Sequence, residues 1–274
     1  MTRLYQMPEL DRKPFRFLKH GFSTKMEGNM SYKYGDPEQV LANRCYFFRK
    51  LGVTFKNCVF LTPEEKESKV CIVDQEDAGK GTKSLESAIK ADALITGEKG
   101  IALVECVADC LPIFLVDKKQ RGIALIQVSF KNAAEIIEKT TKKMIDFFDC
   151  QTGDLVIFIG PSIKKESYKL KPPFLQEKDI SWEPFLKKDP QGLISVDLAG
   201  YAINQFVQNG IRNLVLSGID TAKNEGFFSH YRDKKNEDGE GRFAAVLLMK
   251  KDESRINRQI FKTKQKKLLS TSRF

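Results

Sequence analysis

Four side chains that can take part in chemistry lie within a span of six residues, Glu105, Cys106, Asp109 and Cys110, just before Pro112. A cysteine beside an aspartate offers a thiol and a carboxylate, which are groups used as metal ligands and in nucleophilic catalysis. The alternative is that Cys110 is a small apolar residue of the core, because free cysteines are among the most buried residue types. The spacing alone leaves both interpretations open.

The residues around this cluster predict how its backbone is held. Pro112 fixes its own φ angle and disfavours helix at the residue before it, so residues 108–112 are predicted to form a sharp turn. Apolar runs typical of buried strands lie at residues 101–107, 113–116 and 122–129. A turn between two buried strands would hold Asp109 and Cys110 rigidly.

The rest of the chain alternates between predicted strands and helices. A helix is predicted from Pro37 to residue 51, with Asp36 as its cap, Gly52 as its end, and an apolar face made of Val40, Leu41, Cys45, Phe48 and Leu51. Further helices are predicted at residues 132–148 and 197–208, and further strands at 15–22, 57–61, 70–73, 155–159, 214–217 and 243–249. The succession of strand, helix and strand at 122–159 predicts a βαβ crossover. The sequence therefore predicts a single α/β domain with a mixed sheet and flanking helices.

Composition and charge place the chain among ordinary globular proteins. Of its 274 residues 41% are hydrophobic and 30% charged. No apolar run approaches the ~18 residues of a membrane span, and the N-terminus lacks the apolar core of a signal peptide. Six cysteines without CxxC spacing and without an export signal lead us to expect a cytoplasmic protein.

The net charge of +10 is concentrated at the C-terminus. Residues 250–274 hold nine Lys or Arg and two acidic residues, so the preceding body carries only about +3. We predict that residues 1–249 form the domain and that 250–274 are a basic, flexible extension. This extension could contact nucleic acid or an anionic surface, but a solvated tail is the favoured interpretation.

Several separated segments together resemble one family. The matching runs, in order, are HGFSTK, GDPEQVLANRCYFFRKLGV, ADALIT, GIALVECVADCLPIFLVD, GPSIKKESY, FFSHYRD and GRFAAVLL. In this order they resemble the laccase-domain proteins, also called the multicopper polyphenol oxidase-like or peptidoglycan editing factor family. The resemblance covers roughly residues 15–249 and implies a single laccase-domain-type α/β domain. It also implies phosphorolysis or deamination of purine nucleosides at a zinc bound by two histidines and one cysteine.

When the family's metal ligands are matched to this sequence one by one, two of the three are missing. The family's cysteine is Cys110, but its two histidine positions are Lys66 and Gln127 here. Lys66 would be cationic, and the amide of Gln127 offers only a neutral oxygen, so both are poor zinc ligands. We therefore expect zinc to be weakly bound or absent. No copper is expected either, because no set of two His, a Cys and a Met is visible.

The other family positions supply candidate site residues. The catalytic candidates are Asp109, Cys110 and Arg232, and the candidates for substrate binding are Lys25, Gln127, Lys131, Ser229, His230 and Arg242. Two functions remain open on these residues. The chain is either a purine nucleoside phosphorylase or deaminase of this family, or a catalytically inert relative that binds a nucleoside-like or anionic ligand or a protein partner.

Overall fold

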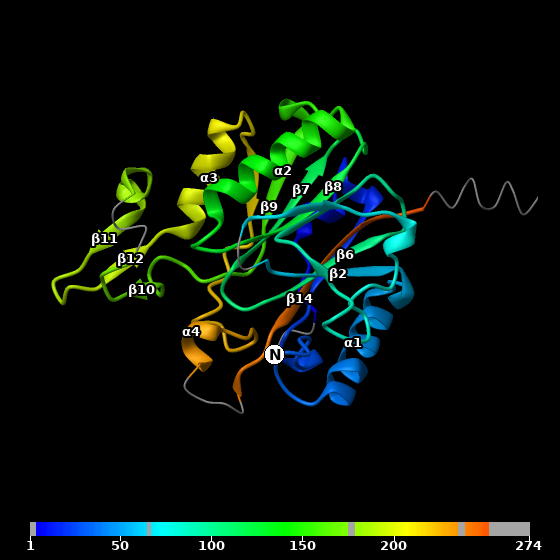
Figure 1. The fold of residues 1–274 in the computed structure, drawn as a ribbon, viewed down its shortest axis with the longest axis horizontal. Coiled ribbons are helices and arrows are strands. Elements are labelled where there is room, and N and C mark those ends of the chain that lie inside the picture. Colours follow the sequence, from blue (N-terminus) through cyan, green and yellow to red (C-terminus); the bar gives the residue numbers. More distant parts are fainter. Residues whose placement is uncertain (1–3, 65–66, 175–178, 235–238, 252–274) are drawn as a thin grey trace, which may run out of the picture.

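The computed structural model describes residues 4–64, 67–174, 179–234 and 239–251 (Figure 1). Its strands form two large sheets and a small one. The five-stranded sheet has the order β1 (Leu18–Phe22), β14 (Phe243–Met249), β6 (Ala102–Val107), β2 (Cys58–Thr62) and β4 (Ile89–Lys90). The six-stranded sheet has the order β13 (Asn213–Leu216), β9 (Leu155–Ile159), β7 (Leu111–Asp117), β8 (Ile123–Val128), β5 (Ala93–Thr96) and β3 (Val70–Ile72).

The two large sheets pack face to face, and helices cover their outer faces. Helices α2 (Ala133–Phe148) and α3 (Leu198–Gln208) lie on the six-stranded sheet, and α1 (Pro37–Leu51) lies on the five-stranded sheet (Figure 1). Side chains alternate along each strand, so β6 sends Leu103 into the core between the sheets and Val104 toward α1. The order of layers is therefore helix, sheet, sheet, helix.

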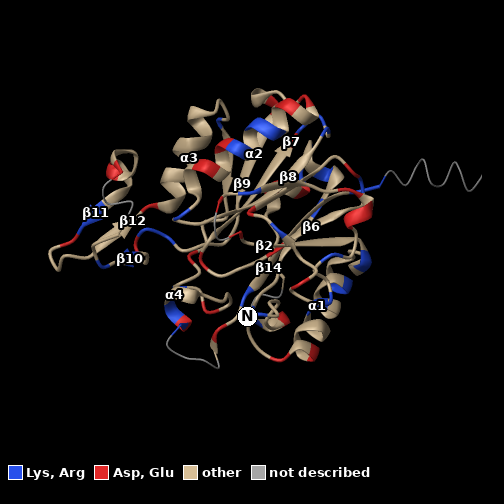
Figure 2. Ribbon diagram, in the orientation of Figure 1, with Lys and Arg blue, Asp and Glu red and all other residues tan. Residues whose placement is uncertain are grey.

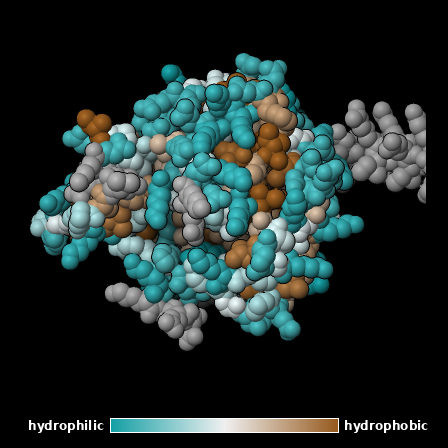
Figure 3. Space-filling view, in the orientation of Figure 1, coloured by the Kyte–Doolittle hydropathy of each residue, from teal (hydrophilic) through white to brown (hydrophobic). Residues whose placement is uncertain are grey.

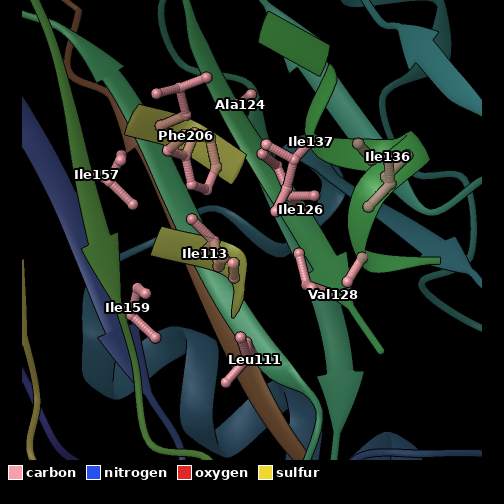
Figure 4. Close-up of a cluster of buried hydrophobic side chains, with 14 of the residues drawn as sticks. Leu111, Ile113, Ala124, Ile126, Val128, Ile136, Ile137, Ile157, Ile159 and Phe206 are labelled. Carbon is pink, nitrogen blue, oxygen red and sulfur yellow. The ribbon is translucent and has the colours of Figure 1, made fainter. Parts of the chain in front are cut away.

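The core beneath α2 and α3 is built from the apolar runs that the sequence marked as strands. Figure 4 shows Ile113, Ile126 and Ile157 from three neighbouring strands meeting Phe206 of α3 and Ile137 of α2. All five side chains are fully buried. This packing fixes β7 and β8, the two strands that follow the Asp109–Cys110 turn.

The predicted βαβ crossover is confirmed. Strands β8 and β9, joined through α2, are parallel to each other, with antiparallel β7 between them. The α/β class with mixed sheets and flanking helices is also confirmed. The sequence did not predict that the strands would divide between two stacked sheets.

The ends of α1 follow the predicted capping residues. The Asp36 carboxylate accepts a hydrogen bond from the backbone N–H of Gln39, and Gly52 adopts the left-handed conformation at the end. The predicted apolar face of this helix was partly wrong, because Cys45 is exposed and Leu41 only half-buried. The buried stripe consists instead of Val40, Arg44, Phe47, Phe48 and Leu51.

A small three-stranded sheet projects from the body in residues 163–196, most of which the sequence left unassigned (Figure 1). It consists of β10 (Lys169–Leu170), β12 (Ile194–Val196) and β11 (Leu186–Lys188). Trp182 joins it to the main core by stacking on Tyr201 of α3, with 3.6 Å between ring centroids. A one-turn helix, α4 (His230–Asp233), lies between β13 and β14.

The surface of the described part is mixed in character. Basic and acidic side chains are interspersed on the helices (Figure 2), and the visible face is mainly hydrophilic with an apolar area (Figure 3). No helix within the described ranges is both long and apolar enough to cross a membrane. The division at residue 249 stays a prediction, because 252–274 lie outside the described residues.

Candidate functional site

The Asp109–Cys110 turn carries the chain from one large sheet to the other. It joins β6 of the five-stranded sheet to β7 of the six-stranded sheet. Asp109 has a positive φ of 78°, a conformation that Asp tolerates better than most side chains. The predicted turn is confirmed at residues 108–110, but Leu111 and Pro112, which were predicted to belong to it, already lie in β7. Both flanking strands are buried.

The Asp109 carboxylate holds the segment that contains α4. Its Oδ1 accepts a hydrogen bond from the hydroxyl of Thr221 at 2.6 Å. Its Oδ2 accepts hydrogen bonds from the Ser229 hydroxyl at 3.1 Å and from the Tyr231 backbone N–H at 2.6 Å. Asp109 and Ser229 thus bring together two segments that are 120 residues apart. Neither side chain lines the pocket beside this turn, and their predicted catalytic and binding roles stay predictions.

A pocket of about 280 Å³ opens beside this turn. Four residues that the sequence selected line it, namely Cys110, Gln127, His230 and Arg242. They come from the β6–β7 turn, from β8, from α4 and from the residue before β14. Other lining residues include Ser31, Lys33, Tyr34, Arg44, Phe60 and Cys106. The fold therefore gathers chemically capable side chains from both sheets around one cavity, which we call the central pocket.

Cys110 is a neutral thiol in this environment. Burial raises its pKa to about 11, and a hydrogen bond with the side chain of Gln127 only partly opposes this effect. A thiol with such a pKa is protonated at neutral pH, and the thiolate is the form that binds metals or attacks electrophiles.

Arg44 is a pocket residue that the sequence interpretation missed. Its guanidinium lies between the rings of Tyr32 and Phe60, at 4.2 and 4.0 Å from the centroids. Its N–H groups donate to the carbonyls of Met30, Gly81 and Thr82. The signal was available, because position 44 falls on the buried stripe of α1 four residues after Val40 and four before Phe48.

Arg242 and His230 also line the pocket. The guanidinium of Arg242 lies 4.0 Å from the centroid of the Tyr34 ring, and its Nη2 donates to the Tyr34 hydroxyl at 2.6 Å. The Glu240 carboxylate contacts both Arg242 and His230, with 2.6 Å to His230 Nδ1. The hydrogen bond with His230 is the main cause that lowers the pKa of Glu240, so this carboxylate is ionised.

Two other predicted residues, Arg232 and Lys25, lie away from this pocket. Arg232 donates to the Asp233 carboxylate and to the carbonyls of Thr221 and Phe227, which organise the loop before α4. Lys25 forms an ion pair with Asp233 at 3.1 Å. Arg232 and Lys25 therefore contact neighbouring segments of the chain. Their predicted catalytic and binding roles stay predictions.

A second cavity of about 570 Å³ adjoins the central pocket at Pro63 and Gln127, which line both. The predicted Lys131 lies here rather than in the central pocket. The other lining residues are Glu64, Glu67, Ser68, Asp92, Ser129, Asn132 and Glu135. We call it the acidic cavity.

The donor atoms of the central pocket do not fit a zinc ion. Zinc in proteins prefers three or four ligands drawn from thiolate, imidazole and carboxylate, whereas the described part of the pocket offers the sulfur of Cys110 beside the amide of Gln127. No three His, Cys, Asp or Glu side chains within the described ranges converge closely enough to hold a metal ion. Lys66, at the remaining family position, lies outside the described residues.

The fold has known counterparts. It superposes on YlmD from Geobacillus stearothermophilus with a TM-score of 0.80 at 23% identity, covering 88% of this chain and 94% of that one. The Bacillus licheniformis protein YfiH gives a TM-score of 0.77 at 22% identity, covering 88% and 98%.

Sequence comparisons give the family. The chain is 24% identical over 233 residues to the purine nucleoside phosphorylase YlmD of Bacillus subtilis, covering 82% of this chain and 80% of that protein. It is 29% identical over 209 residues to the purine nucleoside phosphorylase Cj1217c of Campylobacter jejuni, covering 74% and 82%. The model of one family, described as multi-copper polyphenol oxidoreductase laccase, matches residues 17–250. The chain therefore belongs to the multi-copper polyphenol oxidoreductase laccase family.

Proposed function

We propose that this protein binds a purine nucleoside in the central pocket and that it does so without zinc-assisted phosphorolysis or deamination. One observation carries the proposal: the residues of the pocket converge from both sheets, but Gln127 stands where a metal-binding histidine is expected. Relatives named purine nucleoside phosphorylase supply the substrate class.

The size and lining of the pocket support a ligand of nucleoside size. A volume of about 280 Å³ lies at the lower end of the ~300–1,000 Å³ typical of small-molecule sites. The stacked pair of Arg242 and Tyr34 offers a flat surface for a base. Lys33 and the two guanidinium groups make the pocket positively charged, which favours a hydroxyl-rich or anionic ligand.

The chemistry of the pocket argues against catalysis of the family type. Zinc would activate water or polarise a leaving group if it were bound. Here the amide of Gln127 is a poor ligand, and Cys110 is the one family ligand among the described lining residues, so we derive no catalytic step through a metal. The remaining groups can bind and orient a nucleoside, and Asp109 keeps the walls of the pocket together.

Calorimetric titration of the full chain with inosine, adenosine and methylthioadenosine tests binding. We expect saturable binding that Arg242→Met weakens about tenfold, since removing a pocket guanidinium removes charge and donors. Arg212→Met is the matched control, because Arg212 is exposed and lies outside the pocket. Absence of binding by all three nucleosides would refute the proposed function.

The second candidate is an active phosphorylase or deaminase, which the names of the relatives favour. Turnover of the same nucleosides with and without phosphate, compared with a Cys110→Ala variant, separates the two candidates. We expect no turnover above that control and less than stoichiometric zinc by elemental analysis. Stoichiometric zinc with release of base or ammonia would establish the second candidate instead.

A further inference from the structure

Among its described lining residues the acidic cavity has more acidic than basic side chains, whereas the central pocket is lined by basic ones. Four carboxylates line the acidic cavity, from Glu64, Glu67, Asp92 and Glu135, and Lys131 is the basic side chain among its described lining residues. Glu135 is paired with Lys139 at 2.6 Å. Burial is the main cause that raises the pKa of Asp92, and the nearby charge of Glu64 raises it further. The local field therefore favours a cation.

Gln127 places an unpaired acceptor between the two cavities. The residue is only 9% exposed, and its Oε1 is buried without a hydrogen-bond partner. Since Oε1 is unpaired, the amide contacts the Cys110 thiol through its nitrogen. A buried acceptor without a donor is costly, so this oxygen calls for a ligand that donates a hydrogen bond.

Glu105 is a buried carboxyl group of the neighbouring sheet. Along β6 it alternates with the residues that face α1, so it points into the space between the sheets, as Leu103 does. Gln127 points into the same space from β8, in phase with Leu125. Glu105 is fully buried and neither of its oxygens has a partner. Burial, together with the charge of Asp92, raises its pKa.

The cation that fits this arrangement is organic rather than a bare metal ion. The described acidic side chains do not converge on one point as metal ligands do, and the cavity of about 570 Å³ is much larger than an ion. An ammonium group satisfies both observations, because it donates several hydrogen bonds and can be carried by a larger molecule.

We propose that the acidic cavity binds an amine cation, and that the ligand is a purine nucleoside whose amine-bearing substituent reaches past Gln127 from the central pocket. The second half of this inference rests on the proposed function. The shared border at Pro63 and Gln127 is what allows one molecule to occupy both cavities. Positive and negative surroundings on the two sides then fix the direction in which the ligand binds.

The test compares two nucleosides that differ only in the charged group. Calorimetry with 5′-amino-5′-deoxyadenosine and 5′-deoxyadenosine should show that the amine binds about tenfold more tightly at low salt. The double variant Glu67→Gln/Glu135→Gln should abolish this difference. The control double variant Glu98→Gln/Glu138→Gln changes the net charge equally at exposed positions outside the cavity and should retain it.

A diamine without a nucleoside part tests the cation site independently of nucleoside binding. We expect 1,4-diaminobutane to raise the thermal unfolding midpoint of the wild type and the control variant, but not that of the acidic-cavity variant. If nucleosides fail to bind while the diamine behaves in this way, the proposed function fails and the cation site stands. Equal affinity of the two nucleosides in the wild type overturns the inference. A diamine effect that is absent from the wild type, or identical in both double variants, overturns it as well.

Discussion

The carboxylate of Asp109 and the hydroxyl of Ser229 lie 3.1 Å apart, although 120 residues separate them in the chain. Ser229 is also the cap of α4, since its hydroxyl accepts a hydrogen bond from the Arg232 backbone N–H. Hydrogen bonds therefore join the turn that carries Cys110 to the helix that carries His230. Displacing either side should move both walls of the central pocket.

Replacing Asp109 should cost both stability and ligand affinity. In Asp109→Ala the buried hydroxyls of Thr221 and Ser229 lose their acceptor, and the new residue tolerates the positive φ poorly. We expect the free energy of unfolding to fall by about 3 kcal/mol, since hydrogen bonds to a charged group contribute about 1.5–3 kcal/mol each. Asp109→Asn keeps an acceptor and the backbone preference, and should lose about half as much. Urea titration measures both, and an alanine variant as stable as the wild type would contradict this role.

Arg44 should prove as important for stability as a core residue. Its side chain is only 3% exposed, and it donates to three main-chain carbonyls. Arg44→Met fills similar space but removes the donor to the Gly81 carbonyl, and it leaves the Met30 and Thr82 carbonyls with only the Cys106 thiol and the Tyr32 hydroxyl. We therefore expect a loss of about 2–4 kcal/mol. Arg44→Lys should recover little of it, because one ammonium cannot replace a planar fork. Arg49→Met, on an exposed position of the same helix, is the control in urea titration. Equal losses in the two methionine variants would count against the proposed role.

The sequence predicted the parts of this structure that depend on local patterns. Apolar runs identified β6, β7, β8 and β9, and capping residues identified both ends of α1. Pro112 correctly placed the turn at Asp109. These features depend on neighbouring residues in the chain, which is why a single sequence was sufficient for them.

The features that the sequence did not predict depend on distant contacts. The division of the strands into two sheets follows from which strand pairs with which, and alternation along one strand does not specify its partner. Arg44 was overlooked because a buried arginine needs acceptors that come from the segments around residues 30 and 81. Arg232 and Lys25 were selected for the site from the resemblance. Only the fold shows that Arg232 donates to main-chain carbonyls and that Lys25 pairs with a carboxylate.

Restoring the missing ligands should restore zinc binding. The double variant Lys66→His/Gln127→His would restore the two histidines that, with Cys110, make the set that the family resemblance implies. A bound zinc would also remove the proton of the Cys110 thiol, whose pKa is otherwise raised to about 11 by burial. We expect about one zinc per chain in the double variant by elemental analysis, and much less in the wild type or in the same variant with Cys110→Ala. Stoichiometric zinc in the wild type would contradict the expectation.

His20 should make the protein less stable in mild acid. The side chain is 1% exposed, and its Nε2 accepts a hydrogen bond from the Met7 backbone N–H at 2.9 Å, which requires the neutral ring. Burial lowers the pKa of His20 from 6.5 to about 4. Above pH 6.5 the ring is neutral in both states, so its contribution is complete. Below pH 6.5 His20 becomes protonated in the unfolded chain but stays neutral in the folded protein. The free energy of unfolding therefore falls until about pH 4.

The size of this effect can be isolated with one variant. The difference between the His20 pKa in the unfolded and in the folded protein lowers the free energy of unfolding by about 3 kcal/mol between pH 7 and pH 4. His20→Gln keeps an acceptor near Met7 but cannot titrate, so its unfolding free energy should fall less over the same range. Buried carboxylates such as Glu27 titrate equally in both proteins, and the difference between the two curves therefore reports His20 alone. Parallel curves from urea titrations at pH 7, 5.5 and 4 would show that His20 is already protonated in the folded state, against the buried, hydrogen-bonded geometry that predicts a neutral ring.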